Sequence, residues 1–418
     1  MPITDSTIEV IKPSGSVEED TARLTELAQR ARQIFFDPGS GQPLRLNRTI
    51  RFGLAGQRFW GSAPWASTVE WHGDPDKATV FALRGNQYMS ISNMMIRPGH
   101  WGTPQEIRMR AGAAITIEDE NGTSAAFCEL DNIFIHAMAD GVLVGGGAEH
   151  RIRRLQLRKL RGRKGLRFFA PSKARALYRC IVDDMVSAEA ESPEYDAIDH
   201  NSYSYSVEVD KAALLNGGRG YTMADDVADG ASYPMWAFAQ DLETDHTAQG
   251  GVELWAGEGF EAVTSWFGSS LGGAGLLAGG AWRGDLALSA CRIYGNAREG
   301  MSITAGKGAA LSGLLVGDNG VMRPGSMAGI LIGGQAENIS IAASCSGDMV
   351  GVRGNAQGWG VILHDKPRRV NLSSFGTLEG NQRGKILNET RTVQHEELIG
   401  AHLSEESIRE GRRSGAYL

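Results

Sequence analysis

The sequence predicts an all-β fold, a parallel β-solenoid whose N-terminal end is closed by a capping helix. Glycine supplies 55 of the 418 residues, nearly twice its usual share, while the hydrophobic fraction of 42% is ordinary. A short strand pattern recurs at a period near 24 residues, and asparagine and glycine mark corners between the strands. Repeats of this kind are typical of coils that stack on one another and bury their apolar residues against the next coil.

The repeat is a four-residue pattern of glycine, an apolar residue, any residue and a second apolar residue. It begins at Gly141, Gly165, Gly251, Gly275, Gly300, Gly329 and Gly360, in steps of 24, 86, 24, 25, 29 and 31 residues. A 38-residue insertion in the long step restores the period, and the polar run 196–233 has that size. One further match, at Gly313, is half a period out of phase and is read as a second strand of the same turn or as a sign of a loose pattern. The residues expected to point inward are Val142, Leu166, Val252, Leu276, Met301, Ile330 and Val361.

Asparagine recurs in two further patterns. It precedes an apolar alternation at Asn93, Asn132, Asn338 and Asn371, and it ends a short polar corner at Asn296, Asn319, Asn355 and Asn381. Asparagine and glycine tolerate the left-handed backbone that a sharp corner needs. The alternative fold is a glycine-rich sandwich or jelly roll, which should show two-residue hairpin turns every 8–12 residues or so. The steadier period of about 24 residues favours the solenoid.

The N-terminal region has the pattern of a capping helix. Ser16 and Glu19 have the spacing of a capping box, and apolar residues then recur at helical spacing. A helix here is expected to cover the open strand edge at the end of the solenoid, although an ordinary surface helix has the same pattern. The expected organisation is an N-terminal segment with the helix over 1–47, the solenoid over 48–390 with its insertion, and a C-terminal tail over 391–418.

Composition limits the possible functions. A net charge of −7 does not suit a protein that coats nucleic acid, and no run of about 18 apolar residues is present to span a membrane. The first residues lack the basic and apolar regions of a signal peptide. Neither the histidines nor the cysteines have the spacing of a metal site or a disulfide framework, and no phosphate loop or nucleophile elbow is found, so no metal or cofactor is expected. The four scattered cysteines are Cys128, Cys180, Cys291 and Cys345.

Residues 18–73 resemble the N-terminal segment of the pectate-lyase-like right-handed parallel β-helix superfamily. The resemblance lies in Glu19-Asp20-Thr21 at the start of the helix, the Pro-Gly turn that ends 34–39, and the strands of 49–56 and 68–71. With the repeats it extends over about 14–390. Members include bacteriophage tailspikes, tail-associated depolymerases and secreted polysaccharide lyases and hydrolases, but also proteins without catalysis. Tailspike-type members are commonly homotrimers, so the resemblance implies a trimer. Unlike a tailspike, this chain is expected to have no separate particle-binding domain and no large C-terminal trimerisation domain.

A candidate site lies around an acidic stretch, residues 183–201, that holds seven acidic residues and a histidine. Asp183 and Asp184 fall on the strand before the expected insertion. On the strand after it, Asp241, Glu243 and Asp245 share one parity and are expected to face outward, whereas Trp236, Phe238 and Leu242 share the other. Glycoside hydrolysis needs two carboxyl groups, so these five acids are the candidate catalytic residues. The alternative is that they keep an exposed strand soluble or bind a cation.

Other residue types add candidates for substrate binding. Trp255, Trp266 and Trp282 are candidate platforms for sugar rings, or else core residues, and Arg283 and Arg292 are candidates to neutralise a uronate in a lyase. The run 151–164 holds eight basic residues in fourteen. It is expected to bind either an acidic polysaccharide or the acidic face of a neighbouring subunit. Nucleic acid is a third option, but the run has no interleaved aromatic residues to support it.

Three functional hypotheses follow. The first is a phage-type β-helix protein that binds and cleaves a cell-surface polysaccharide, located in the virion or outside the cell after lysis. The second is a non-catalytic structural or attachment protein of a virion, in contact with other virion proteins. The third is a bacterial polysaccharide lyase, hydrolase or epimerase, for which a signal peptide would be expected.

Overall fold

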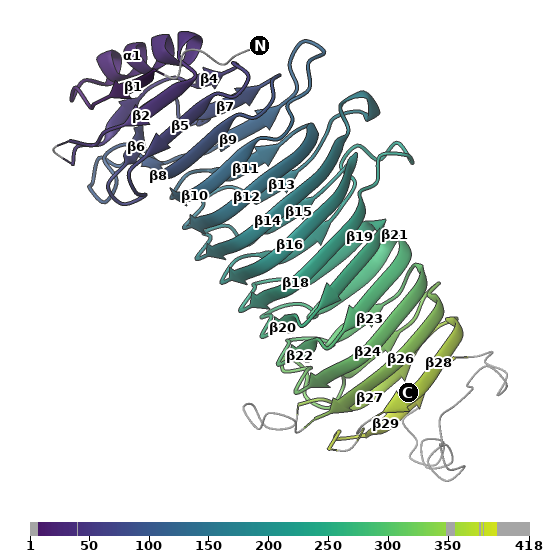
Figure 1. Cartoon of the computed structure of the whole chain (residues 1–418). Helices are drawn as coiled ribbons and strands as arrows, with labels where there is room; N and C mark the ends of the chain where they lie inside the picture. The colour runs from purple at the N-terminus through teal and green to yellow at the C-terminus, as the bar shows by residue number, and fades with distance from the viewer. Residues whose placement is uncertain (1–6, 40, 348–355, 376–377, 379, 391–418) are drawn as a thin grey trace. The chain divides into compact units, whose positions relative to one another are not determined.

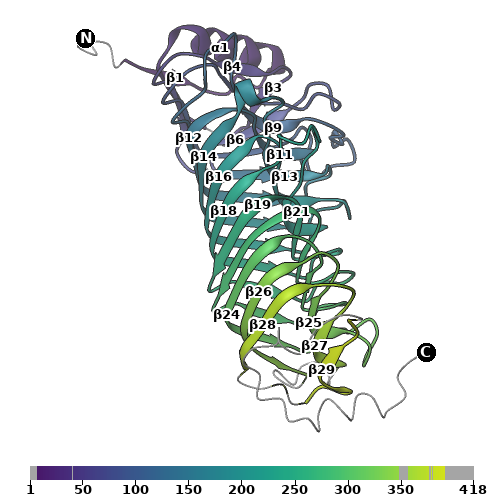
Figure 2. The same cartoon turned by 90° about the vertical axis from the view of Figure 1, so that its right-hand side faces the viewer.

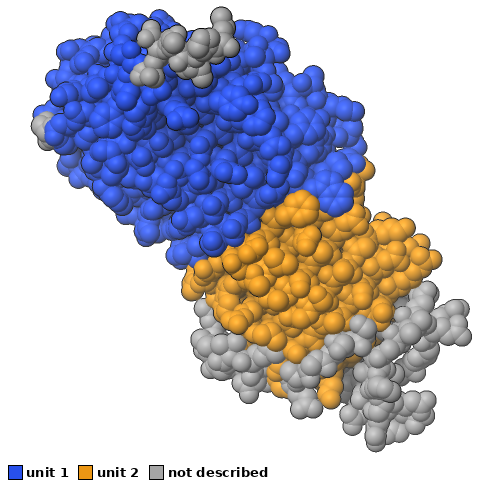
Figure 3. Space-filling view, viewed as in Figure 1, with its two compact units in different colours: residues 1–237 blue, residues 238–418 orange. Residues whose placement is uncertain are grey.

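The computed structural model describes residues 7–39, 41–347, 356–375, 378 and 380–390. The chain divides into two compact units, Met1–Ala237 and Phe238–Leu418 (Figure 3). Both units are built from parallel strands, and one α-helix, α1 (Val17–Arg30), is present among the described residues. The predicted all-β parallel solenoid is therefore confirmed.

The strands follow one another along the chain with short connections. Those of the first unit are β1 (Ile8–Ile11), β2 (Gln33–Phe36), β3 (Leu44–Leu46), β4 (Ile50–Phe52), β5 (Arg58–Gly61), β6 (Thr68–Trp71), β7 (Phe81–Arg84), β8 (Ser90–Pro98), β9 (Ala113–Glu118), β10 (Glu129–His136), β11 (Asp140–Val144), β12 (Gly147–Arg158), β13 (Lys164–Phe168), β14 (Leu177–Ala188), β15 (Asp196–His200), β16 (Ser204–Leu215) and β17 (Arg219–Met223). Strand β18 (Met235–Asp245) begins in the first unit and lies mostly in the second. The others are β19 (Val252–Val263), β20 (Trp266–Gly268), β21 (Leu276–Ser289), β22 (Arg292–Tyr294), β23 (Met301–Ile303), β24 (Lys307–Gly317), β25 (Ala328–Ile332), β26 (Glu337–Ser346), β27 (Trp359–Leu363), β28 (Arg368–Phe375) and β29 (Gly384–Asn388).

Each coil pairs in parallel with the next, as Figures 1 and 2 show for β12, β14 and β16 in the first unit and for β24, β26 and β28 in the second. In the second unit Val252, Leu276, Met301, Ile330 and Val361 form one in-register row. In the first unit Val142 pairs with Leu166. All seven residues predicted to point inward are at most 1% exposed, so the predicted register is confirmed. Gly313 lies within β24, a second strand of its coil.

The glycine period has a steric cause at the corner before each of these strands. In the second unit Asn296 donates to Asn319, Asn319 to Gln357 and Gln357 to Asn381, so one amide per coil stacks inside the corner. A Cβ on Gly300 would lie 2.6 Å from Asn319 Nδ2 and 2.7 Å from the Gly329 carbonyl oxygen. The glycine therefore leaves room for the amide row. Three of the predicted corner asparagines belong to this row, and Asn355 lies outside the described residues.

Replacing Gly300 with alanine should destabilise the second unit by about 1–3 kcal/mol, because an added methyl group overpacks a filled interior. The change is measured as a lower midpoint of urea unfolding. Gly53→Ala is the control, since the nearest atom to a Cβ there is a carbonyl oxygen at 3.8 Å. Equal stability of the Gly300→Ala variant and the wild type would contradict this explanation of the repeat.

The structure differs from the sequence prediction in the long step of the repeat. Residues 196–223 form β15, β16 and β17, and Leu166, Ile198 and Tyr221 stack in register through them. This part of the chain continues the coils instead of forming an inserted loop. The glycine position is occupied by Ala197 in β15, which does not fit the pattern, and by Gly220 in β17, which does.

The N-terminal helix caps the first coil through polar groups (Figure 1). The Ser16 hydroxyl accepts the backbone N–H of Glu19 at 3.3 Å, which confirms the predicted N-cap. Asp20 and Thr21 are fully buried and accept the backbone N–H groups of Arg45 at 3.0 Å and of Asn47 at 3.1 Å. These N–H groups lie at the strand edge formed by β3. The helix therefore satisfies backbone donors that could otherwise pair with a strand of another molecule.

Two other expectations from composition can be compared with the structure. All four cysteines are free and buried, and burial raises the pKa of the Cys128 thiol to about 12. Within the described part of the chain, no helix has both the length and the apolar character needed to cross a membrane.

Candidate functional site

The acidic stretch that the sequence singled out divides into a surface part and a buried part. Asp183 and Asp184 lie on the outside of β14, half-buried and exposed respectively. Asp196 begins β15 and Asp199 lies within it, and they are 3% and 0% exposed. The two parts therefore have different roles.

Asp183 belongs to a row of polar side chains on the outer face of the first unit. Parallel pairing places one residue from each of five strands, β8, β10, β12, β14 and β16, in register. This polar row consists of Ser92, Asp131, Arg153, Asp183 and Asp210. Neighbouring members are one strand spacing apart, about 4.8 Å. Asp183 and Asp210 are thus adjacent carboxylates, here called the acidic pair.

The acidic pair has few partners. Arg153 is in register with Asp183, but its guanidinium pairs with Glu129 and, at 3.8 Å, with Asp131 on the other side. Asp183 has no hydrogen-bond or ion-pair partner among the described residues. Asp210 has an ion pair of 3.9 Å with Lys211, and its Oδ1 is buried without a hydrogen-bond partner among them. The acidic pair therefore has only this one long ion pair among the described residues, although Oδ1 of Asp210 is itself buried.

The spacing of the acidic pair suits glycoside chemistry. Two carboxyl groups about 5–5.5 Å apart act as nucleophile and general acid/base in retaining glycosidases. One strand spacing, about 4.8 Å, brings the backbones of Asp183 and Asp210 to nearly that distance. The sequence analysis missed Asp210 because it lies in the supposed insertion. A signal was present, since Tyr178, Val182 and Asp183 each have an identical residue 27 positions later, at Tyr205, Val209 and Asp210.

Aromatic side chains lie just before or near the start of the strands that carry the polar row. Tyr88 and Phe127 stack with ring centroids 4.9 Å apart and planes 9° apart, and they are 58% and 43% exposed. Tyr178 and Tyr205, here called the tyrosine pair, have centroids 5.4 Å apart, and Tyr178 is 52% exposed. A cavity of about 450 Å³ lies beside the first pair, and its lining includes Trp60, Tyr88, Phe127, Glu129 and Asp131. Exposed aromatic rings at the edge of a polar face are features of a sugar-binding groove.

The basic run of β12 is largely neutralised within the chain. Its ion pairs reach acidic residues of neighbouring coils and loops: Arg153 with Glu129, Arg154 with Asp131, Arg158 with Glu189, Arg161 with Glu106, Arg163 with Glu194 and Lys164 with Asp196. Two of its exposed members, Arg151 and Lys159, have no ion pair in the described part of the chain. Most of this positive charge therefore stabilises stacked coils and is not free for a partner.

The acids predicted on β18 lie on the surface of the second unit. Asp241 and Glu243 are exposed, and Asp241 accepts the hydroxyl of Thr264 at 2.5 Å. Asp245 forms an ion pair of 2.8 Å with His246. The expected parity was wrong for Trp236 and Phe238, which are 41% and 40% exposed, while Leu242 is buried. The cause is the left-handed backbone of Asp241, with φ 49°, which interrupts the alternation. Joint action of these acids with Asp183 stays a prediction.

The predicted tryptophan platforms have different environments. Trp255 is 42% exposed, and its Nε1 donates to Glu253 at 2.8 Å. Trp266 is half-buried against Tyr294, with ring centroids 5.4 Å apart. Trp282 is 4% exposed and is a core residue, so the platform role is wrong for it. Arg283 and Arg292 are exposed, and their role in binding stays a prediction.

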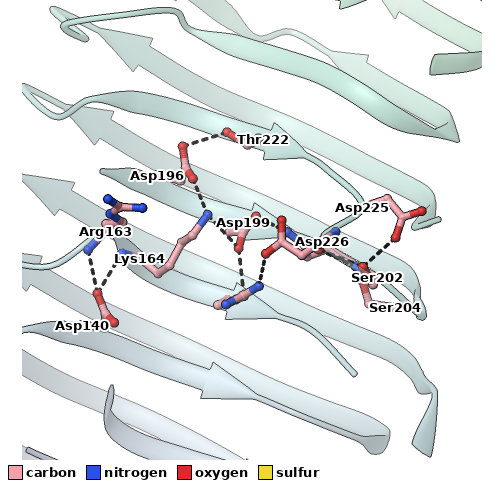
Figure 4. A network of polar contacts seen from close by, with 12 residues as sticks. Asp140, Arg163, Lys164, Asp196, Asp199, Ser202, Ser204, Thr222, Asp225 and Asp226 are labelled. Atoms are coloured by element: carbon pink, nitrogen blue, oxygen red, sulfur yellow. Dashed lines mark hydrogen bonds and ion pairs between the residues drawn. The ribbon is translucent and has the colours of Figure 1, made fainter. Parts of the chain in front are cut away.

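The buried half of the acidic stretch forms an ion network on β13, β15 and β17 (Figure 4). Asp199 lies 3.0 Å from Lys164 and 3.0 Å from Arg167, and it accepts the Asn201 amide at 3.0 Å. Burial raises the pKa of Asp199 although two cations oppose the change. Asp196 pairs with Lys164 at 2.5 Å and with Arg219 at 3.1 Å. These carboxylates are closed to a substrate, so they hold coils together.

Among the described residues, no group of three His, Cys, Asp or Glu side chains is placed to hold a metal ion. His200, at the end of β15, is fully buried, and burial lowers its pKa to about 4. Its ring nitrogens contact the Tyr221 hydroxyl and the Ser204 carbonyl, so it is a neutral structural residue.

Comparison with known proteins shows a likeness of fold. No family model and no curated protein matches the sequence. Among solved structures, tailspike protein 3 of bacteriophage CBA120 is similar with a TM-score of 0.63 and 12% identity, over 91% of this chain and 60% of that one. The catalytic domain of Agl-KA has a TM-score of 0.55 and 9% identity, over 94% of this chain and 69% of that one. The A-module of the Azotobacter vinelandii mannuronan C-5 epimerase AlgE4 has a TM-score of 0.53 and 9% identity, over 93% and 95%.

The likeness to these structures supports the fold, a right-handed parallel β-helix. The chain spans about 60% of the length of the tailspike. At 9–12% identity the comparisons establish the fold and leave the reaction to be argued from the site.

Proposed function

We propose that this protein binds a cell-surface polysaccharide along the polar row and cleaves it at the acidic pair. The observation that carries the proposal is the adjacency of Asp183 and Asp210, two in-register carboxylates with free oxygens. The cavity at Tyr88 is lined by Ser92 and Asp131 of the polar row, and the exposed tyrosine pair lies near the start of β14 and β16. A tailspike and a polysaccharide epimerase among the structural neighbours support the substrate class.

In this mechanism the sugar chain lies across the strands of the first unit. Aromatic rings at the corner contact its apolar faces, and the acidic pair lies at the scissile bond. One carboxylate acts as nucleophile while the other donates a proton to the leaving oxygen and then accepts one from water. The neighbouring Arg153 pairs with Glu129 and Asp131 on its other side, so it does not neutralise the acidic pair.

Replacing Tyr178 with alanine should weaken polysaccharide binding about tenfold, which corresponds to ~1.4 kcal/mol. The tyrosine is exposed and rests on Tyr205, so its loss removes contact area without opening the core. Binding is measured by isothermal titration against a panel of purified bacterial capsular and O-chain polysaccharides. Trp255→Ala is the matched comparison in the second unit. If that variant loses binding and Tyr178→Ala does not, the groove has been assigned to the wrong unit.

A non-catalytic attachment function is the second candidate. Glu129 and Asp131 are neutralised by arginines, so most of the acidic groups on this face have a structural role. A face with so few free carboxylates also suits binding without cleavage. Polysaccharide binding without release of reducing ends would indicate this function. We further propose that the protein is a homotrimer in a virion, as the tailspike likeness supports. Light scattering that gives the mass of a monomer at micromolar concentration would contradict the trimer.

A further inference from the structure

A row of four aromatic rings lies on another outer face of the first unit, past the corner at Asn132. Trp65 contacts Phe134, Phe134 contacts His136, and His136 contacts Trp101, with ring centroids 4.8, 5.6 and 4.8 Å apart. Phe134 and His136 are on β10, Trp65 comes from the turn between β5 and β6, and Trp101 comes from the loop after β8. These four residues are here called the ring cluster. None of them belongs to the polar row.

The two tryptophans of the ring cluster are held in place but open to solvent. Trp65 is 71% exposed on a tight turn, in which Ser67 N–H bonds to the Ala63 carbonyl at 2.8 Å and Ser62 N–H to the Ser67 hydroxyl at 2.9 Å. Trp101 is 40% exposed, and the Arg97 guanidinium lies 5.0 Å from its ring centroid. Indoles fixed before a ligand arrives lose little conformational freedom on binding.

The support beneath Trp101 is a network of ion pairs. Arg97 is held by Glu70 at 2.8 Å. The N–H of Gly102 donates to Glu106 at 2.9 Å, and Glu106 pairs with Arg161 at 2.5 Å. The loop is therefore anchored on both sides of Trp101, by Arg97 before it and by Gly102 after it.

His136 supplies the observation that points to a ligand. Its side chain is 9% exposed, and its Nε2 has no hydrogen-bond partner among the described residues. A buried polar atom without a partner is unfavourable, and a hydrogen bond from a ligand hydroxyl would remove that cost. Burial lowers the pKa of His136, so the ring is neutral at neutral pH.

The charges around His136 indicate the class of ligand. Two cations, Lys159 and Arg161, and two anions, Glu106 and Glu189, act on the imidazole, so its surroundings are balanced. Exposed apolar ring faces beside a single neutral hydrogen-bonding group match a ligand with apolar C–H faces and hydroxyl edges. An uncharged sugar ring has this combination, whereas a charged ligand would find no opposite net charge.

We propose that the ring cluster is a second carbohydrate-binding site, which takes an uncharged pyranose chain. Sugar rings pack on Trp65 and Trp101, and a hydroxyl bonds to Nε2 of His136. The site does not depend on the acidic pair or on cleavage. A second point of attachment on one chain raises the effective affinity for a long polysaccharide.

The test titrates neutral hexasaccharides of glucose, mannose and galactose, followed by tryptophan fluorescence and calorimetry up to about 10 mM, well above a weak Kd of about 1 mM. At least one should bind, and Trp65→Ala and His136→Phe should each weaken it at least fivefold. The phenylalanine keeps the ring packing and removes Nε2. Trp236→Ala, which removes another exposed indole outside both proposed sites, should bind as the wild type does.

Two results would overturn the proposal. The first is that no neutral hexasaccharide binds. The second is binding that is unchanged in both Trp65→Ala and His136→Phe. Loss of binding in Tyr178→Ala alone would place the sugar on the polar row, which rejects the ring cluster and leaves the proposed function standing.

Discussion

Replacing either member of the acidic pair with its amide, Asp183→Asn or Asp210→Asn, should lower polysaccharide cleavage by about 10²–10⁴-fold, the usual contribution of a general acid or base. An amide neither donates the proton that the leaving oxygen needs nor forms a glycosyl-enzyme bond. Both side chains lie outside the core, so stability should change by less than about 0.5 kcal/mol. The measurement is the release of reducing ends, with thermal melting in parallel.

Two further amide variants test which carboxylates carry out the cleavage. Asp184→Asn changes the next residue of β14, which is exposed at a corner with φ 58°, and should retain full activity. Glu243→Gln tests the acids of β18 and should also retain activity if the acidic pair is the catalytic pair. An inactive Glu243→Gln variant beside active Asp183→Asn and Asp210→Asn variants would move the reaction to β18.

Removing the carboxylate of Asp199 should destabilise the first unit by about 3–5 kcal/mol, because Lys164 and Arg167 would lose a fully buried partner. The Asp199→Ala variant should therefore unfold at a markedly lower urea concentration. Asp226→Asn is the matched control. It removes an ion pair with the same Arg167, but Asp226 is 52% exposed, and such pairs contribute about 1 kcal/mol or less.

A small effect of Asp199→Ala, similar to that of Asp226→Asn, would show that the network in Figure 4 does not hold β13 and β15 together. The buried carboxylates would then have to be considered again as functional groups. A large effect with wild-type activity in the remaining folded protein would confirm their structural role.

The fold could be predicted because its signal is repeated in many coils. The same steric conflict, a Cβ against an amide or carbonyl of the next coil, recurs at Gly275, Gly300 and Gly329. Each occurrence adds to the periodic pattern. The coil at β15 was missed because Ala197 stands where other coils have glycine, and the search was for glycine alone.

The candidate site was harder to predict for two physical reasons. Residues of the polar row are brought together by stacking, so Asp210 becomes a neighbour of Asp183 only when the length of the coil between them is known. Acidic residues close in sequence were also separated by burial, since Asp183 faces outward while Asp199 is closed within an ion network. Left-handed corner residues such as Asp241 shift the alternation, which moved Trp236 and Phe238 to the surface.

The measurement that tests the central claim most directly is a crystal structure of the Asp183→Asn variant with a fragment of a polysaccharide that the wild type binds. The account predicts sugar density across β10, β12, β14 and β16, with a ring against Tyr178 and a glycosidic oxygen within hydrogen-bond reach of Asp210. Sugar bound in the second unit, with the polar row empty, would contradict it.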